Sequence, residues 1–366
     1  MNTAESATTV PRAAGEAAQP SVASAAGIAA DLVAVLVAVT GGEPRVLTLQ
    51  DARLLPSGAF ELTHRSLQSG LRAWVERQTH HPVGYVEQLY TFADRDRGLG
   101  PEQRVISVSY LGLTRERPPG PGDQTSWQDW YLYLPWEDRR VGVPPMIDAV
   151  ILPALRAFAK AAPNIALRHD RANRIAATFG TDGRPWNEEF VLQRYELLYE
   201  AGLIPEARRG EADAGAAPDH DGFGLDRSKA IVIDSENSER DLREKPASTF
   251  SHPALVHGRS MSLDHRRILA TGIARLRAKI KYHPVVFELM PDTFTLLQLQ
   301  RCVEALAGRL VHKQNFRRLV EQQELVEETG QSSQETGGRP AKLFRFRREV
   351  LFERALVGTK LPISRS

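Results

Sequence analysis

"PDTFTLLQLQRCVEALAG" (residues 291–308) and "HKQNFRRLVEQQELV" (residues 312–326) are two amphipathic runs separated by three residues. Thr295 stands where a helix N-cap is needed, and Gly308 stands where the first helix is expected to end. Both runs place apolar residues at helical spacing on one face: Leu299, Val303 and Leu306 in the first, then Phe316, Leu319 and Val320 in the second. The pattern predicts two short helices joined by a tight turn.

The opposite face of the second predicted helix is basic and polar. Lys313, Gln314, Arg317 and Arg318 share it at positions i, i+1, i+4 and i+5. Arginine pairs with guanine, asparagine and glutamine pair with adenine, and lysine or arginine also meets phosphates. The two helices therefore have the pattern of a helix-turn-helix whose second helix enters the major groove.

Two strand-like runs follow, "ELVEETG" (324–330) and "AKLFRFRRE" (341–349), joined by the polar, glycine-rich "QSSQETGGRP". A hairpin after a recognition helix is the wing of a winged helix, which puts Arg339 and Lys342 at or near the wing tip. The alternative is a small helical dimerisation module with a charged surface. On the winged-helix interpretation, the candidate DNA-binding residues are Thr295, Gln298, Lys313, Gln314, Asn315, Arg317, Arg318, Arg339 and Lys342.

Charge is unevenly distributed along the chain. The 366 residues carry a net charge of +2, but residues 257–350 hold 17 Lys and Arg against 10 Asp and Glu. This excess favours a polyanionic partner for the C-terminal end, with an ordinary solvated basic surface as the alternative. Cys302 is the single cysteine, so it cannot form an intrachain disulfide, and a cytoplasmic protein is expected.

The N-terminal half alternates strand and helix patterns. The apolar run at 33–40 is too short to span a bilayer and predicts a buried strand, so no membrane partner is expected. The other expected strands are 45–49, 83–93, 104–113 and 130–136, and the expected helices are 66–79, 147–162 and 187–204. Together these elements predict an α+β fold.

A further helix is expected over "SLDHRRILATGIARLRAKIKY" (262–282). One apolar stripe runs through Leu269, Ile273, Leu276 and Ile280. The basic residues are expected to lie away from this stripe: Arg266, Arg267, Arg277 and Lys281.

The segment "LPSGAFELTHRSLQSGLRAWVERQTHHP" (55–82) partly follows the Nudix box. In that motif a glycine is followed by five residues, a glutamate, seven residues and Arg-Glu-apolar-x-Glu-Glu-x-Gly. Placed on Gly58, the register puts Arg72 at the arginine and Glu76 at the first glutamate of the last pair. The remaining motif positions hold other residues: His64, Ala73, Arg77 and Thr79. An ordinary surface helix is the alternative.

The missing carboxylates bear directly on catalysis. Mg²⁺ is held by oxygen ligands, which Ala73 and Arg77 cannot supply, and Arg77 brings positive charge to a metal position. On a Nudix fold, metal-assisted hydrolysis is then expected to be lost while a nucleotide-binding cleft remains. Arg104 opens a strand of this domain and is a candidate phosphate contact. The candidate effector-binding residues are Gly58, Arg72, Glu76 and Arg104, and no metal ligand or required cofactor is expected.

The run from "YHPVVFELMPDTFTLLQLQ" (282–300) through "GGRPAKLFRFR" (337–347) resembles the C-terminal domain of Nudix-related transcriptional regulators of NAD metabolism. The degenerate box and "RVISVSYLGL" (104–113) resemble their N-terminal domain. The resemblance covers residues 28–347. It implies a homodimer, a winged helix on each subunit that binds a palindromic operator in double-stranded DNA, and a Nudix-like domain that senses ADP-ribose, NAD or a related nucleotide. A segment near 206–251 departs from compact members of the family and resembles a longer branch of NAD-synthesis regulators.

The expected organisation is an N-terminal Nudix-like α/β/α domain followed by a C-terminal winged helix-turn-helix domain. The predicted boundaries are a disordered tail at 1–26, the effector domain at 27–205, a linker at 206–251, the DNA-binding domain at 252–350 and a tail at 351–366. A repressor of NAD biosynthesis or salvage genes is the expected function. A Nudix hydrolase of ADP-ribose or a related diphosphate is the rival, and a structural partner-binding protein is a third possibility.

Overall fold

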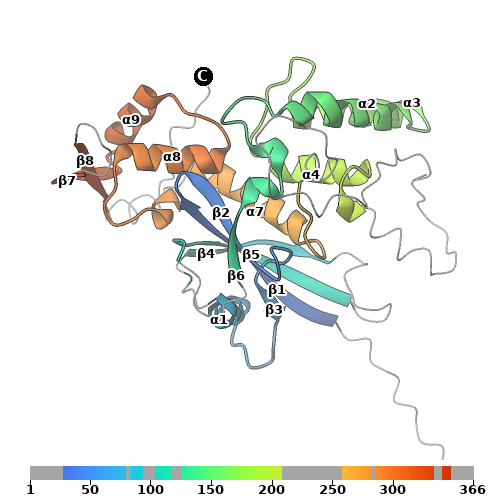
Figure 1. The fold of residues 1–366 in the computed structure, drawn as a ribbon. Helices are drawn as coiled ribbons and strands as arrows, with labels where there is room; N and C mark the ends of the chain where they lie inside the picture. Colours follow the sequence, from blue (N-terminus) through green and yellow to red (C-terminus); the bar gives the residue numbers. More distant parts are fainter. Residues whose placement is uncertain are drawn as a thin grey trace, which may run out of the picture.

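The computed structural model describes residues 28–79, 83, 85–93, 104–117, 125–207, 258–281, 285–333 and 340–347. At its centre lies a six-stranded mixed sheet with strand order β4-β5-β1-β2-β6, and β3 pairs with β1 (Figure 1). β1 runs parallel to β5 and antiparallel to β2 and β3. The strands are β1 (Ile28–Thr40), β2 (Glu43–Leu49), β3 (Ser57–Ala59), β4 (Tyr85–Phe92), β5 (Arg104–Leu113) and β6 (Thr125–Asp129).

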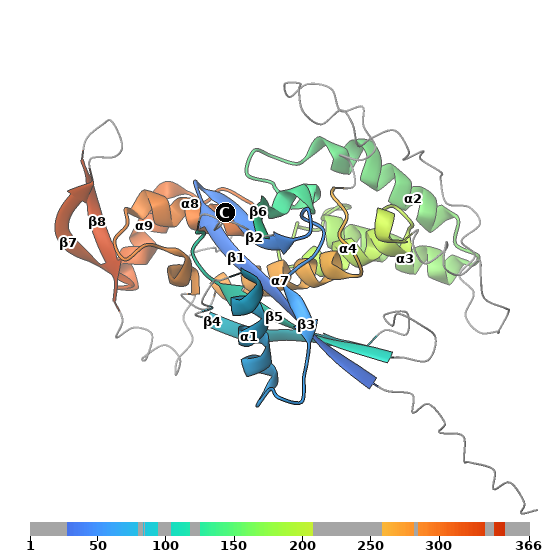
Figure 2. The same ribbon diagram turned by 60° about the horizontal axis from the view of Figure 1, so that its bottom comes forward.

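β1 is buried on both faces, which explains its continuous apolar sequence. Leu32, Ala34 and Leu36 pack with residues of α1 (Leu67–Thr79). The alternate residues Val33, Val35 and Val37 belong to the cluster that contains α7 (His265–Ile280). One helix therefore covers each face of the sheet (Figure 2), and the predicted α/β/α arrangement is confirmed.

α7 was predicted as a helix, but the expected position was wrong for two of the four basic residues placed away from its apolar stripe. Arg266 and Arg277 are fully or almost fully buried, because α7 packs on the sheet with one face and against α4 with another. A Cβ added to Gly272 would lie 3.0 Å from Cγ1 of Val35, so glycine allows the helix to approach β1 closely. The predicted domain boundaries stay a prediction, although the packing of α7 on β1, β4 and β5 joins this helix to the sheet.

The strand predicted over residues 130–136 is wrong. The segment forms two short 3-10 helices, η2 (Trp130–Leu132) and η3 (Pro135–Glu137). The Asp129 carboxylate accepts a hydrogen bond from the Tyr131 backbone at 2.9 Å, which turns the chain at the end of β6. The apolar residues of this segment were mistaken for a strand because they fill the core: Trp130, Tyr133, Leu134 and Trp136 are each 0% exposed.

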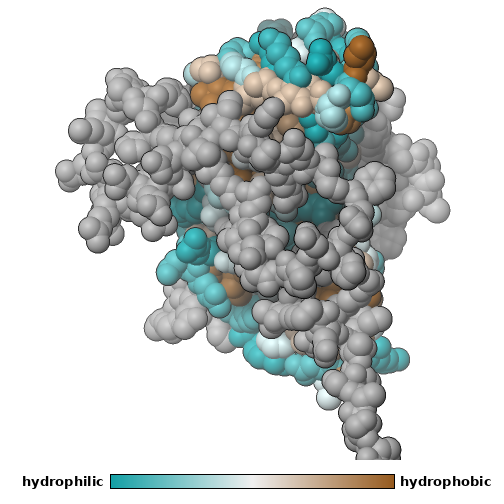
Figure 3. Space-filling view, turned by 90° about the vertical axis from the view of Figure 1, so that its right-hand side faces the viewer, coloured by the Kyte–Doolittle hydropathy of each residue, from teal (hydrophilic) through white to brown (hydrophobic). Residues whose placement is uncertain are grey.

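Helices between η3 and residue 207 form what we call the helical module, and α4 packs against α7. The module comprises η4 (Ile147–Ile151), α2 (Leu152–Lys160), α3 (Ile165–Phe179) and α4 (Val191–Glu200). α3 was not predicted, although it has an N-cap at Asn164 and a left-handed C-cap at Gly180. The side of the molecule that carries these helices mixes hydrophilic residues with scattered hydrophobic ones (Figure 3).

The C-terminal head, residues 285–333 and 340–347, has the predicted winged helix arrangement. Its elements are η5 (Val285–Leu289), α8 (Leu296–Ala307), α9 (Lys313–Gln322), β7 (Val326–Ser333) and β8 (Ala341–Phe346). β7 and β8 pair antiparallel as a two-stranded wing. Phe344 exchanges backbone hydrogen bonds with Phe294 at 2.8 and 2.9 Å, which attaches the wing next to the start of α8.

Some predictions lie outside the described residues: the tails at 1–26 and 351–366, most of the linker at 206–251, and Arg339. Glu206 and Ala207, at the start of the predicted linker, are buried. Within the described ranges, the helices are too short or too polar to cross a lipid bilayer.

Candidate nucleic-acid interface and nucleotide site

α9 separates its apolar and polar residues as the sequence predicted. Phe316 and Val320 are 1% and 0% exposed and anchor the helix in the head, and Leu319 is half-buried. The five predicted contacts on this helix are all exposed: Lys313, Gln314, Asn315, Arg317 and Arg318. α9 therefore presents donors for both bases and phosphates on one surface.

The basic groups of α9 are available for a partner. Among the residues that the structure describes, Lys313, Arg317 and Arg318 form no ion pair. In contrast, Arg266 and Arg277 of α7 are buried and paired with Glu206 and Glu137. The positive charge near the C-terminal end therefore has two parts. These two arginines of α7 are held in buried ion pairs, whereas the basic side chains of α9 are exposed.

Polar contacts within α8 and its turn position α9. Glu304, 9% exposed, accepts hydrogen bonds from the Val311 backbone at 3.0 Å and from the Gln300 side chain at 2.9 Å. This carboxylate connects the body of α8 to the residues just before α9. Gly308 ends α8 with φ of +70°, a conformation that glycine adopts at no steric cost.

Two predicted DNA contacts, Thr295 and Gln298, form the capping box of α8. The Thr295 hydroxyl accepts from the Gln298 backbone at 3.2 Å, and the Gln298 side chain accepts from the Thr295 backbone at 2.7 Å. Thr295 is 6% exposed, whereas Gln298 is exposed. The structure therefore assigns both side chains a capping role, and a DNA contact by either stays a prediction.

Charged pairs cover much of the wing. Lys342, near the start of β8, lies 2.8 Å from the Glu328 carboxylate, and Arg345 lies 2.5 Å from that of Glu327. Lys342 is 68% exposed in its side chain, so this pair is solvated and weak. A role for Lys342 in DNA contact stays a prediction.

The degenerate Nudix box forms the β3–α1 unit. A Cβ added to Gly58 would lie 2.2 Å from Cδ2 of Trp74, so the indole covers this glycine. The Trp74 indole N–H donates to the Ala59 carbonyl at 2.8 Å, and the Arg77 guanidinium lies 4.7 Å from the ring centroid. The sequence reasoning missed this packing role, although Trp74 occupies the apolar position of the motif.

The other predicted effector residues lie on α1 and at the start of β5. Arg72 donates a hydrogen bond to the Val83 carbonyl, and Glu76 is exposed one turn later on α1. Arg104 opens β5, and its side chain lies outside the described residues. Across the described ranges, no group of three or more His, Cys, Asp or Glu is suited to hold a metal ion. Effector binding by these residues stays a prediction.

A buried ion cluster that the sequence did not predict joins η3, α7, the helical module and the head. Glu137 accepts from Arg194 of α4 at 2.6 and 2.9 Å, and from Arg277 of α7 at 2.6 Å. Burial by itself raises the pKa of Glu137, but the two arginines outweigh it and hold this pKa below its ordinary value. Arg277 also donates to the carbonyl of Leu306 at 3.0 Å, which reaches the C-terminal end of α8.

Comparison with known proteins finds a similarity for the head. The family model described as the NrtR DNA-binding winged helix domain matches residues 286–346. This similarity is confined to the C-terminal head. A curated relative, the ADPR responsive transcriptional repressor NtrR of Acinetobacter baylyi, is 41% identical over 86 residues, which are 24% of this chain and 34% of that protein.

Other similarities are more distant. A protein-glutamate methylesterase/protein-glutamine glutaminase of Nitrobacter winogradskyi is 30% identical over 164 residues, 35% of this chain and 38% of that protein. The chain spans little more than a third of the length of either curated relative. The crystal structure of Shewanella oneidensis NrtR complexed with a 27mer DNA is 16% identical, with a TM-score of 0.48, and the match covers 90% of this chain and 99% of that one.

Proposed function

We propose that this protein is a DNA-binding transcriptional regulator, acting as a repressor of NAD biosynthesis or salvage genes. The observation that carries the proposal is the exposed, unpaired basic face of α9 on a domain that matches the NrtR DNA-binding winged helix. Lys313 and Arg317 supply phosphate and guanine contacts, and Gln314 and Asn315 supply adenine contacts. A protein of this kind works in the cytoplasm, where the operator is.

A homodimer on a palindromic operator places two α9 helices in successive turns of the major groove. The curated repressor named above is described as ADPR-responsive, which supports ADP-ribose as the effector of this chain. The effector binds the β3–α1 side of the sheet. Because it binds one of two states of the protein more tightly than the other, and these states differ in affinity for the operator, the effector changes operator binding.

A Nudix hydrolase is the rival function. Two features of the β3–α1 unit support regulation instead. The motif's other acidic positions hold His64, Ala73 and Arg77, which leaves Glu76 alone, and the Trp74 indole occupies the space next to Gly58. A hydrolase of this type requires several carboxylates around its metal.

The test is a fluorescence-anisotropy titration with DNA from upstream of the protein's own gene and of neighbouring NAD genes. It is run with and without ADP-ribose, NAD and ATP, at a fixed salt concentration. Saturable binding that resists unrelated competitor DNA, and that one nucleotide shifts, is the expected result. Metal-dependent release of AMP from ADP-ribose at an enzymatic rate, without operator binding, would establish the rival.

A further inference from the structure

The head contacts the rest of the fold, an interface that we call the seam, and the contacts differ between the two ends of this seam. Both ends involve α8, which carries the turn that positions α9. At the C-terminal end of α8 the contacts are buried hydrogen bonds and ion pairs. Nearer its N-terminal end, α8 and the β1–β2 turn line a cavity.

The anchored end is formed by the segment 131–139 and Arg277. The Arg277–Glu137–Arg194 cluster lies directly beneath it, and side chains of these three residues are 0–1% exposed. The hydrogen bonds to the last turn of α8 run from Tyr131 Oη to the Ala305 carbonyl (2.7 Å), from Arg277 Nε to the Leu306 carbonyl (3.0 Å) and from the Arg139 backbone to the Gly308 carbonyl (2.7 Å). These bonds hold three successive parts of the helix end, so this end is fixed to the segment 131–139 and to α7.

Gly308 confirms how closely the anchored end is packed. A Cβ on this residue would lie 2.5 Å from the Glu137 carbonyl and 2.5 Å from Arg277 Nη2. Arg309, the next residue, reaches the Glu188 carboxylate of the helical module at 3.5 Å. The helical module therefore supports the anchored end through both Arg194 and Glu188.

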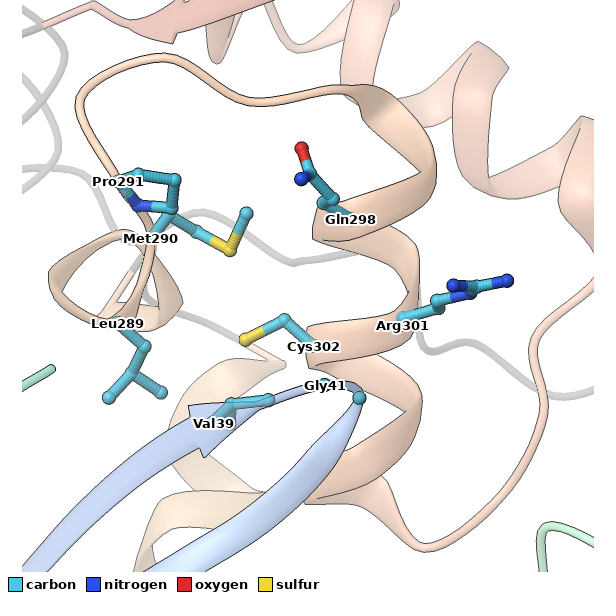
Figure 4. A pocket seen from close by; sticks show the side chains of 9 residues that line it. Val39, Gly41, Leu289, Met290, Pro291, Gln298, Arg301 and Cys302 are labelled. Atoms are coloured by element: carbon cyan, nitrogen blue, oxygen red, sulfur yellow. The ribbon is translucent and has the colours of Figure 1, made fainter. Parts of the chain in front are cut away.

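The open end is a cavity of about 290 Å³ between the β1–β2 turn and the head (Figure 4). Its sides are the turn (Val39, Gly41 and Gly42), the segment 289–291, and one face of α8 (Gln298, Arg301 and Cys302). Met290 and Cys302 point toward the space between them (Figure 4). Burial raises the pKa of the Cys302 thiol to about 12, so the thiol is neutral and forms part of an apolar wall.

We propose that the head rotates as a unit about the anchored end of α8, and that the cavity is the space into which the β1–β2 turn and α8 close. Tightly packed interfaces resist small displacements, whereas an unfilled space at one end permits them. Rotation about the last turn of α8 displaces α9 and thereby changes the separation of two recognition helices in a dimer. The link to effector response rests on the proposed function, but the rotation itself does not.

Spin-label distance measurements on the full chain test this inference. In a Cys302→Ser background, one labelled pair spans the open end (Thr40→Cys with Arg301→Cys), and a second flanks the anchored end (Val141→Cys with Leu310→Cys). All four positions are exposed, so the labels do not disturb the core. The free protein is expected to show a distance distribution at least twice as broad across the open end as across the anchored end.

Equal widths across both ends in the free protein would overturn the inference, whether or not any nucleotide affects DNA binding. A second variant fills the cavity: the open-end pair is measured again with Cys302→Met in place of Cys302→Ser. The larger side chain is expected to narrow the distribution toward that of the anchored pair, and an unchanged width would also contradict the hinge. Operator binding by the unlabelled wild type is measured separately, so failure of the proposed function is distinguished from failure of the hinge.

Discussion

Replacing Glu137 by Gln should cost far more stability than an ordinary ion pair contributes. The Glu137 side chain is 0% exposed and accepts from two arginines at 2.6–2.9 Å. Removing one partner of a buried ion pair costs about 3–5 kcal/mol. Because one carboxylate here serves two guanidinium groups, its loss leaves two buried cations facing each other, and we expect about 4–5 kcal/mol, the upper part of that range.

The assay is urea unfolding followed by tryptophan fluorescence, with Glu196→Gln as the matched control. Glu196 pairs with Arg267 at 2.8 Å, but the two side chains are 40% and 30% exposed. A solvated pair of this kind contributes about 0.2–1 kcal/mol. Equal losses of unfolding free energy in the two variants would refute the claim that the buried cluster holds the seam together.

The pH dependence has a defined sign. Since the folded state holds the pKa of Glu137 below its ordinary value of 4.5, the stabilisation is complete above that pH. It is lost as the pH falls through the lower folded-state pKa. The difference in stability between wild type and Glu137→Gln should therefore shrink only below about pH 4.5. A difference that shrinks instead between pH 6 and 9 would assign the effect to another group.

Three further outcomes are expected. Gly58→Ala should cost about 1–3 kcal/mol of unfolding free energy by overpacking, because its Cβ meets Trp74 at 2.2 Å; Trp74→Ala should remove most of that cost in a double-mutant cycle. Gly272→Val should lower the thermal midpoint, since the Cβ of even an alanine lies 3.0 Å from Val35; an unchanged midpoint would show that α7 can move off β1. Lys313→Ala should reduce the slope of log operator affinity against log salt by about 1, and an unchanged slope would exclude a phosphate contact.

The elements that the sequence predicted correctly are those with a decisive local pattern. β5 was expected at 104–113 and is found there, and α9 has its predicted inward and outward faces. The run at 33–40 was correctly predicted as a buried strand, because a strand covered on both faces is apolar throughout. Local pattern was also sufficient for the capping residue Thr295.

The errors arise where distant partners decide the structure. The sequence distance between Glu137 and Arg277 is 140 residues, so nothing local shows that this arginine is buried. Residues 130–136 were predicted as a strand because their apolar content reflects burial rather than backbone geometry. The packing of Trp74 was not predicted because the Nudix motif requires only an apolar residue at its position, which does not show what fills the space beside Gly58.

The central claim is that α9 binds operator DNA. The most direct test is an anisotropy titration of operator DNA with wild type, Arg317→Glu and Arg168→Glu, with circular dichroism to confirm folding. Arg168 is an exposed helical arginine of the helical module, which makes it the matched control for charge reversal. The account predicts loss of specific binding in Arg317→Glu alone, whereas wild-type affinity in that variant would contradict it.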